Sequence, residues 1–337
     1  MPQYSKGKQM HMQFTQDFFQ PEIREDFEIS AMMKRAWAAQ MEVLQVIADI
    51  CERNGLQYFA DWGTLLGAVR HQGFIPWDDD IDICLKREDY NRLISILPPQ
   101  LPHGFVMAGM YAGTERLRMA AYVPQLRVMA DETLWDFNDY MKYFHGFPYQ
   151  RAGIDIFPLD YIPVEDELAD IQKIMMKQGT NLLENWTTLE NAGKLEERLQ
   201  EYEKLCNVRI DRQGDVKNWL WKLTDAIASL YHKEEAEYIT NYTFWIEKDG
   251  YKMKKEWYDE AVMLPFENMQ IPAPAIYDEA LRAQFGDYMV PVQGAADHDY
   301  PFYGHMENEL KKQIKAVGFD GSVEEFCQAV SSGRLRV

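Results

Sequence analysis

Residues 63–83 of the chain read GTLLGAVRHQGFIPWDDDIDI. This stretch contains four aspartates within five positions: Asp78, Asp79, Asp80 and Asp82. Because side chains two apart on a β-strand point to the same side, the alternation of aspartate with isoleucine predicts a strand. Asp80 and Asp82 then share one face while the isoleucines anchor the strand in a core. We expect Asp78 to join this pair and Asp79 to point away.

Carboxylates that converge on one face repel each other. At a separation of about 4 Å, two like charges repel by about 4 kcal/mol at an effective dielectric constant of 20. The pair therefore needs raised pKa values or a cation between the carboxylates. A divalent ion such as Mg²⁺ or Mn²⁺ suits Asp80 and Asp82, since Mg²⁺ binds one or two carboxylates and completes its shell with water and phosphate oxygens. The alternative is a solvated acidic turn without a ligand.

Two other segments carry groups that suit such a site. Gly63 and Thr64 precede the acids, and a glycine there lets the backbone approach a phosphate closely. Asp155 lies between two isoleucines in GIDIFPLD, residues 153–160, which reads as a second apolar strand. We predict Asp155 as a third metal ligand. The alternative is an edge-strand aspartate that faces water.

Three basic residues are candidates for contact with phosphate. Arg70 and His71 lie between the Gly63-Thr64 turn and the acids, and the alternative for both is a surface pair. Arg127 lies in the strand-like segment VPQLRVMA, residues 123–130. An arginine fork matches a phosphate group with two hydrogen bonds, so Arg127 is a second candidate for this contact.

Composition limits the function classes. The chain has 337 residues, a hydrophobic fraction of 47% and a formal net charge of −19. This charge repels nucleic acid and anionic membranes, so a phosphate-bearing ligand needs a metal ion or a local basic pocket. The four cysteines form no CxxC pair, and no apolar run of about 18 residues predicts a membrane span. We expect a cytoplasmic protein without nucleic-acid partners, and its oligomeric state stays open.

Hydrophobic periodicity divides the chain into four parts. Apolar residues recur at helical spacing from residue 29 to 48, with Asn54-Gly55 as a stop, and further helices are expected over 87–97, 277–285 and 323–330. A strand is expected within 119–129. The predicted parts are an N-terminal extension (1–27), a catalytic core (28–164), a helical lobe (165–250) and a C-terminal return that completes the core (251–337).

Three segments together resemble the signature blocks of the LicD family, whose members are phosphocholine transferases of bacterial surface glycans related to fukutin and fukutin-related protein. The segments are residues 63–83, GIDIFPLDYIP (153–163) and LPFENMQIPAPAIYDEALRAQFGDYMVP (264–291). The resemblance implies a nucleotidyltransferase-type α/β (α+β) fold, a mixed sheet flanked by helices with an added helical lobe. It also implies Gly63 and Thr64 as the phosphate-binding turn, Asp80 and Asp82 as the metal pair and Asp155 as the third acid.

The resemblance further implies a reaction. Phosphocholine would pass from CDP-choline to a hydroxyl of a surface glycan, such as lipopolysaccharide or a teichoic acid precursor, with release of CMP. One alternative is transfer of phosphoribitol, phosphoglycerol or a nucleotidyl group, which would use the same metal residues. Another alternative is a metal-dependent glycan-binding module without catalysis.

Overall fold

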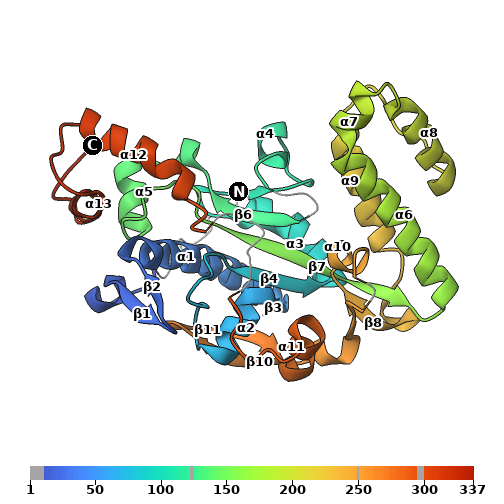
Figure 1. Ribbon diagram of the computed structural model, residues 1–337, viewed down its shortest axis with the longest axis horizontal. Helices are drawn as coiled ribbons and strands as arrows, with labels where there is room; N and C mark the ends of the chain where they lie inside the picture. Colours follow the sequence, from blue (N-terminus) through green and yellow to red (C-terminus); the bar gives the residue numbers. More distant parts are fainter. Residues whose placement is uncertain (1–10, 122–124, 249, 294–299) are drawn as a thin grey trace, which may run out of the picture.

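Figure 1 shows the computed structural model of the chain, which describes residues 11–121, 125–248, 250–293 and 300–337. The strands of its main sheet are β3 (Tyr58–Ala60), β4 (Asp82–Lys86), β5 (Phe105–Ala108), β6 (Leu126–Ala130), β7 (Gly153–Pro163), β8 (Ala236–Thr240) and β9 (Met253–Lys254). Their order is β3-β4-β7-β6-β5, and β8 pairs with β7 and β9. Strands β4 and β7 are parallel, whereas the other neighbours are antiparallel. The predicted mixed sheet is confirmed.

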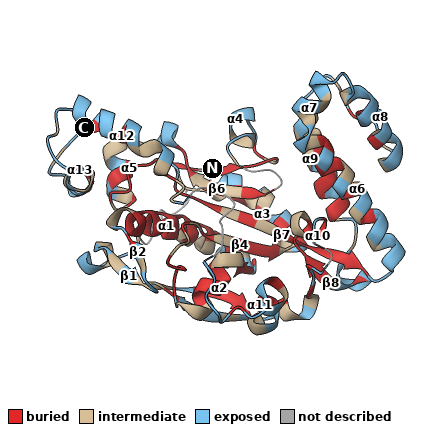
Figure 2. Ribbon diagram, in the orientation of Figure 1, coloured by how far each residue is buried: buried red, intermediate tan, exposed pale blue. Residues whose placement is uncertain are grey.

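The first helix, α1 (Ala31–Asn54), is buried along most of its length and packs against β6 and β7 (Figure 2). The Ser30 hydroxyl caps its start by accepting a hydrogen bond from the N–H of Met33, and Gly55 ends it in the left-handed conformation (φ 60°). Glycine adopts this conformation without steric cost, so the stop expected at Asn54-Gly55 is confirmed.

Two short helices flank the acidic stretch. Helix α2 (Trp62–Arg70) packs against β3 and β4, and α3 (Arg87–Gln100) packs against β4, β5 and β7. The helix expected over 87–97 extends further than predicted, because Pro98 and Pro99 both lie within the last turn of α3. The φ angle of proline near −65° is helical, so here the chain keeps helical geometry for one more turn.

The segment 165–250 is only partly helical. Helices α6 (Asp166–Glu184), α7 (Trp186–Asn191), α8 (Leu195–Cys206) and α9 (Val216–Ala228) stand apart from the rest at one end of the sheet (Figure 1). They enclose a hydrophobic core of their own. Strand β8 and helix α10 (Tyr242–Trp245) follow within the same segment. Because β8 pairs with the second half of β7, the last part of the expected lobe extends the central sheet.

The remaining elements lie at the periphery of the central sheet. They are β1 (Glu22–Arg24), β2 (Phe27–Ile29), α4 (Glu115–Arg118), α5 (Phe137–Tyr143), β10 (Ala261–Phe266), β11 (Met269–Pro274), α11 (Tyr277–Phe285), α12 (Glu307–Ala316) and α13 (Val323–Ser331). The helices expected over 277–285 and 323–330 are confirmed. The strand expected within 119–129 begins only at Leu126 among the described residues. None of the helices in the described ranges combines the length and apolarity needed to cross a membrane.

Candidate active site

The sheet register brings three of the predicted residues into one row. Asp82 on β4 pairs with Asp155 on β7, and Asp155 pairs with Arg127 on β6. Residues paired across a sheet point to the same face, and neighbouring strands lie about 4.8 Å apart. Two carboxylates and one guanidinium, far apart in the sequence, are therefore neighbours on one face of the sheet.

The loop before β4 adds a second group of acids. One carboxylate oxygen from each of Asp78, Asp79 and Asp80 lies within 4.8 Å of the other two. The expectation that Asp79 points away is wrong: its carboxylate joins this group and accepts a hydrogen bond from the N–H of Phe302 (2.6 Å). The reason is that β4 begins at Asp82, so strand alternation does not govern residues 78–81.

Helix α1 holds this acidic loop in place. The indole Nε1 of Trp37 donates to the carbonyl of Asp78 (3.1 Å), and Nε2 of Gln40 donates to the carbonyl of Asp79 (2.6 Å). Trp37 and Gln40 are both buried on α1. These hydrogen bonds fix the backbone of Asp78 and Asp79 against the buried helix, whereas the two carboxylates take no part in them.

We call Asp78, Asp79, Asp80, Asp82 and Asp155 the carboxylate cluster. The negative charges of these residues repel one another. The pKa of Asp82 is raised well above its ordinary value, first by burial and then by the charges of Asp80, Asp155, Asp78 and Asp61. The pKa of Asp78 is also raised, by burial and then by the charge of Asp80 and a hydrogen bond with it. These shifts mean that the protein alone stabilises the carboxylate charges poorly. An all-oxygen set of this kind fits a hard divalent cation such as Mg²⁺ or Mn²⁺.

Gly63 and Thr64 lie in the first turn of α2, against the acids. A Cβ atom at Gly63 would lie 2.2 Å from a carboxylate oxygen of Asp78, so a larger residue here would displace this carboxylate. The Thr64 hydroxyl accepts a hydrogen bond from the N–H of Asp82 (2.8 Å) and so joins α2 to β4. N–H groups in the first turn of a helix have no intrahelical partner, which makes this turn suitable for an anion.

Arg127 is bound to a carboxylate of the cluster. One guanidinium nitrogen of Arg127 lies 2.9 Å from each oxygen of Asp155. The two side chains are about 25% and 14% exposed. Arg127 therefore orients Asp155, and any contact with a phosphate would use its other nitrogens.

The structure does not join Arg70 and His71 to the acids through any contact among the described residues. Nη1 of Arg70 donates to the carbonyl of Tyr288 (2.8 Å). Nε2 of His71 lies 3.3 Å from a carboxylate oxygen of Glu25, and burial lowers the pKa of His71. Arg70 is the last residue of α2 and His71 follows it, so both lie at the end of the helix away from Gly63 and Thr64. Their contact with a donor phosphate stays a prediction.

Sequence reasoning missed Asp61, which is 1% exposed and precedes α2. Its carboxylate accepts hydrogen bonds from the N–H of Trp62 (3.0 Å) and from Nε2 of Gln284 (3.2 Å). Burial raises the pKa of Asp61 to about 6. An aspartate directly before a helix is a typical N-cap, and this signal could have identified it.

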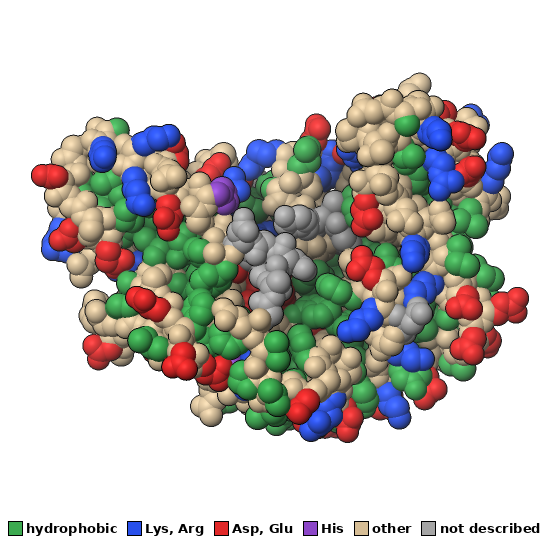
Figure 3. All heavy atoms as spheres, viewed as in Figure 1, with side chains coloured by type: hydrophobic (Ala, Val, Ile, Leu, Met, Phe, Trp, Pro, Cys, Tyr) green, Lys and Arg blue, Asp and Glu red, His purple; other side chains and the backbone are tan. Residues whose placement is uncertain are grey.

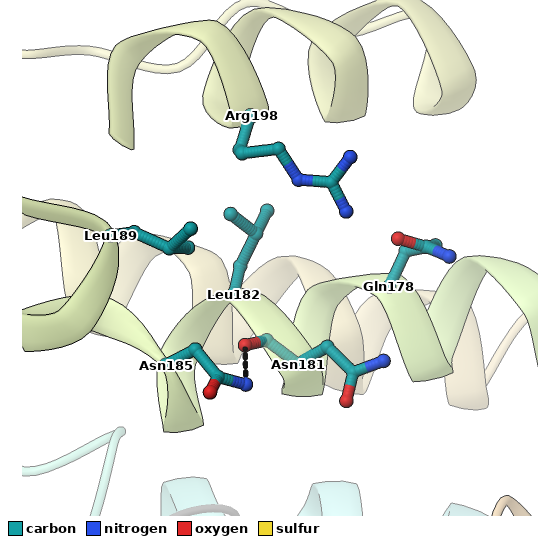
Figure 4. Close-up of a pocket in the computed structure, with 6 residues that line it drawn as sticks. All are labelled: Gln178, Asn181, Leu182, Asn185, Leu189 and Arg198. Carbon is teal, nitrogen blue, oxygen red and sulfur yellow. Dashed lines mark hydrogen bonds between the residues drawn. The ribbon is translucent and has the colours of Figure 1, made fainter. Parts of the chain in front are cut away.

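A cavity of about 370 Å³ lies in the helical lobe, between α6 and α8 (Figure 4). Its lining is polar and aliphatic: Gln178, Asn181, Leu182, Asn185, Leu189 and Arg198. None of these residues belongs to the carboxylate cluster. In the space-filling view the helical lobe projects beyond the neighbouring part of the molecule (Figure 3).

Comparison with known proteins agrees with this geometry. Residues 55–169 match the family described as LicD/FKTN/FKRP, nucleotidyltransferase domain. These residues include β3, α2, the acidic loop, β4 and β7. Over residues 55–169 the chain is similar to the nucleotidyltransferase domain of this family, and the resemblance found in the sequence is confirmed.

Individual relatives cover the chain to different extents. The lipopolysaccharide cholinephosphotransferase LicD of Haemophilus influenzae is 25% identical over 264 residues, which are 74% of this chain and 88% of that protein. An uncharacterized protein of Rickettsia prowazekii is 52% identical over 50 residues, 15% of this chain and 19% of that protein. The human ribitol 5-phosphate transferase FKRP is 39% identical over 51 residues, 15% of this chain and 10% of that protein. The similarity to the LicD and FKRP transferases supports a phosphotransferase activity for this chain.

Proposed function

We propose that this protein transfers phosphocholine from CDP-choline to a hydroxyl group of a surface glycan and releases CMP. The observation that carries the proposal is the group formed by Asp78, Asp79 and Asp80 beside the Gly63-Thr64 turn. Asp82 interacts electrostatically with this group and lies opposite Asp155 in the sheet. Extended similarity to a lipopolysaccharide cholinephosphotransferase supports phosphocholine as the group and a glycan as the acceptor.

In this proposal Asp80, Asp82 and Asp155 hold a divalent cation, Mg²⁺ or Mn²⁺. When bound, the ion supplies positive charge that stabilises the diphosphate of the donor and the phosphate of the leaving CMP. Support comes from the crowding of the carboxylates, which raises the pKa of Asp82. A chain with a net charge of −19 also needs a cation to bind a diphosphate well.

The side chains of the protein then position the reactants. The first turn of α2 presents the N–H groups of Gly63 and Thr64 to a donor phosphate. The acceptor hydroxyl oxygen forms a bond to the β-phosphorus, and the bond from this phosphorus to the bridging oxygen breaks, so that CMP leaves with the electron pair. The hydroxyl proton passes to a carboxylate of the cluster. Arg127 holds Asp155 in place through two short contacts.

An aromatic cluster next to the Gly63-Thr64 turn favours choline as the transferred group. The Trp62 ring stacks on Tyr251 with a centroid distance of 5.1 Å and lies 4.1 Å from the centroid of Phe244. Aromatic faces attract a quaternary ammonium group, each by about 0.5–2 kcal/mol. A Trp62→Leu variant should therefore raise KM for CDP-choline, whereas Trp186→Leu in the helical lobe should leave it unchanged.

Transfer of phosphoribitol is the second candidate, and the match to FKRP over 51 residues favours it. A ribitol pocket would pair polar groups with hydroxyls and would reject choline, because these groups would lose their partners. CMP release from CDP-choline, CDP-ribitol and CDP-glycerol with one mixed glycan acceptor separates the candidates. Fastest release from CDP-choline supports the proposal, and faster release from CDP-ribitol or CDP-glycerol contradicts it.

A further inference from the structure

We propose a second metal site, separate from the carboxylate cluster, in which His11, Glu42 and His145 bind Zn²⁺. The three residues come from distant parts of the sequence: the N-terminal segment, helix α1 and the turn after α5. One potential ligand atom from each lies within 4.8 Å of the other two. Two imidazoles with one carboxylate are a donor set that Zn²⁺ prefers and Mg²⁺ does not.

The distances fit a tetrahedral ion. Nδ1 of His11 lies 3.4 Å from Oε1 of Glu42, and Nε2 of His145 lies 2.8 Å from the same oxygen. Zinc bonds of about 2.0–2.1 Å at tetrahedral angles place ligand atoms roughly 3.4 Å apart. The first distance already has this value, and the second requires a shift of about half an ångström. A water molecule would supply the fourth ligand.

The surroundings orient the ligands. Nε2 of His11 lies 2.9 Å from the carbonyl of Tyr143. Nδ1 of His11 lies 3.0 Å from the carbonyl of Met12 and 3.4 Å from Oε1 of Glu42. A metal ion at Nδ1 would replace the contact with Met12, while Nε2 would keep its proton and donate to Tyr143, which is the usual way in which an outer partner fixes the tautomer of a metal-binding histidine. His145 has a left-handed backbone (φ 54°), which is uncommon for histidine, and this conformation places its ring against Glu42.

Burial makes a bare carboxylate costly at this position. The Glu42 side chain is 1% exposed, and the partners of Oε1 in the described residues are the two histidines and the N–H of Met12 (3.0 Å). Phe14 packs edge-on against the His145 ring at 4.6 Å. A buried anion needs a charged partner, and a cation bound between the three side chains would provide one.

The site is distinct from the carboxylate cluster because the two lie on different sides of α1. Gln40 reaches the acidic loop, and Glu42 follows two residues later. At about 100° per residue, Glu42 is rotated by roughly 200° from Gln40. A zinc ion here would tie the N-terminal segment and the turn after α5 to the central helix, and would leave the transferase chemistry to the acids.

The test uses the untagged full-length chain, freed of metal with a chelator and titrated with Zn²⁺ in millimolar Mg²⁺ by calorimetry. We expect one high-affinity Zn²⁺ per chain, a rise in Tm on binding, and visible absorption bands of tetrahedral Co²⁺ when cobalt replaces zinc. His11→Ala and His145→Asn should each weaken binding at least about 10-fold. The His11 side chain is 37% exposed, so its removal should not prevent folding, and asparagine tolerates the left-handed backbone at 145.

Two matched controls separate this site from others. His103→Ala removes an exposed histidine, and Asp80→Asn disables the carboxylate cluster, so both variants should bind Zn²⁺ as the wild type does. The proposal is overturned if the wild type takes up no Zn²⁺ under these conditions, or if His11→Ala and His145→Asn bind it unchanged. It is also overturned if Asp80→Asn abolishes the uptake, because the ion would then occupy the carboxylate cluster.

Discussion

Replacement of Arg87 by methionine should destabilise the protein by several kcal/mol. The guanidinium of Arg87 on α3 binds Asp160 on β7 (2.5 and 2.9 Å) and Asp225 on α9 (3.0 and 3.1 Å). All three side chains are at most 4% exposed. Arg87 thus joins the central sheet to the helical lobe through a network that is excluded from water.

The magnitude follows from what the substitution leaves behind. Removing one partner of a buried ion pair costs about 3–5 kcal/mol, since the remaining charge is uncompensated, and Arg87→Met leaves two carboxylates. Arg87 opposes the effect of burial on the pKa of Asp160, so without Arg87 this pKa would rise further. The native state would then bind more protons than the unfolded state, so stability would fall as pH rises through the window above the ordinary aspartate pKa near 3.9. The loss should therefore be largest at neutral pH and shrink toward pH 4.

Urea unfolding followed by tryptophan fluorescence, with Tm as a second measure, tests this expectation. Arg92→Met is the matched control, because Arg92 lies on the same helix but is 52% exposed and pairs with Asp89 at the surface. Its substitution should cost less than about 0.5 kcal/mol. Adding Asp225→Asn to Arg87→Met should restore part of the stability. A loss below about 1 kcal/mol for Arg87→Met at pH 7, or a loss that does not shrink toward pH 4, would refute the reasoning.

Other predictions concern the turn and the row of charged residues. Asp61→Asn keeps an N-cap but removes a carboxylate whose pKa is raised to about 6. Because a raised pKa in the folded state lowers the stability of the wild type as pH increases from about 4 to 6, the variant should be more stable than the wild type at pH 7 by up to about 3 kcal/mol. This gain should disappear below about pH 4. Equal stability at both pH values would contradict the assignment. Gly67→Ala places a Cβ atom 2.3 Å from the carbonyl oxygen of Gly73 and should lower stability by about 1–3 kcal/mol in urea unfolding; an unchanged midpoint would show that the contact relaxes freely. Arg127→Gln should lower kcat with little change in Tm, since it releases Asp155, and a variant with normal kcat would remove Arg127 from the site.

Much of the central sheet could be predicted because its residues obey simple periodicities. The alternation around Asp82 and Asp155 predicted two strands, and the register places these two residues opposite each other. Asn54-Gly55 predicted the end of α1 for a local reason, the left-handed cap. In each of these cases the information lies within a few neighbouring residues.

Features that depend on distant contacts could not be predicted in this way. The position of Asp79 is set by Phe302 and by Gln40, both far away in the sequence. Strand β8 follows a helical segment and is stabilised by pairing with β7. The network around Arg87 joins three elements that carry no common motif. Sequence periodicity reports which side of an element is buried but does not report which partner covers it.

The arrangement of Asp80 and Asp82 in the carboxylate cluster could not be predicted from strand alternation alone. Alternation predicted Asp80 and Asp82 as a pair on a strand, yet β4 begins at Asp82. Asp80 belongs to a loop whose backbone is held by α1. The same residues converge, but through tertiary hydrogen bonds that strand geometry does not describe.

CMP release from CDP-choline with a glycan acceptor tests whether the carboxylate cluster performs phosphocholine transfer. Wild type, Asp80→Asn and Asp82→Asn would be compared at saturating donor and Mg²⁺, with circular dichroism and Tm to verify folding. We expect rapid CMP release by the wild type, its loss on chelation, and loss of turnover in both folded variants. Near wild-type turnover in either variant, or turnover that persists in EDTA, would contradict this expectation.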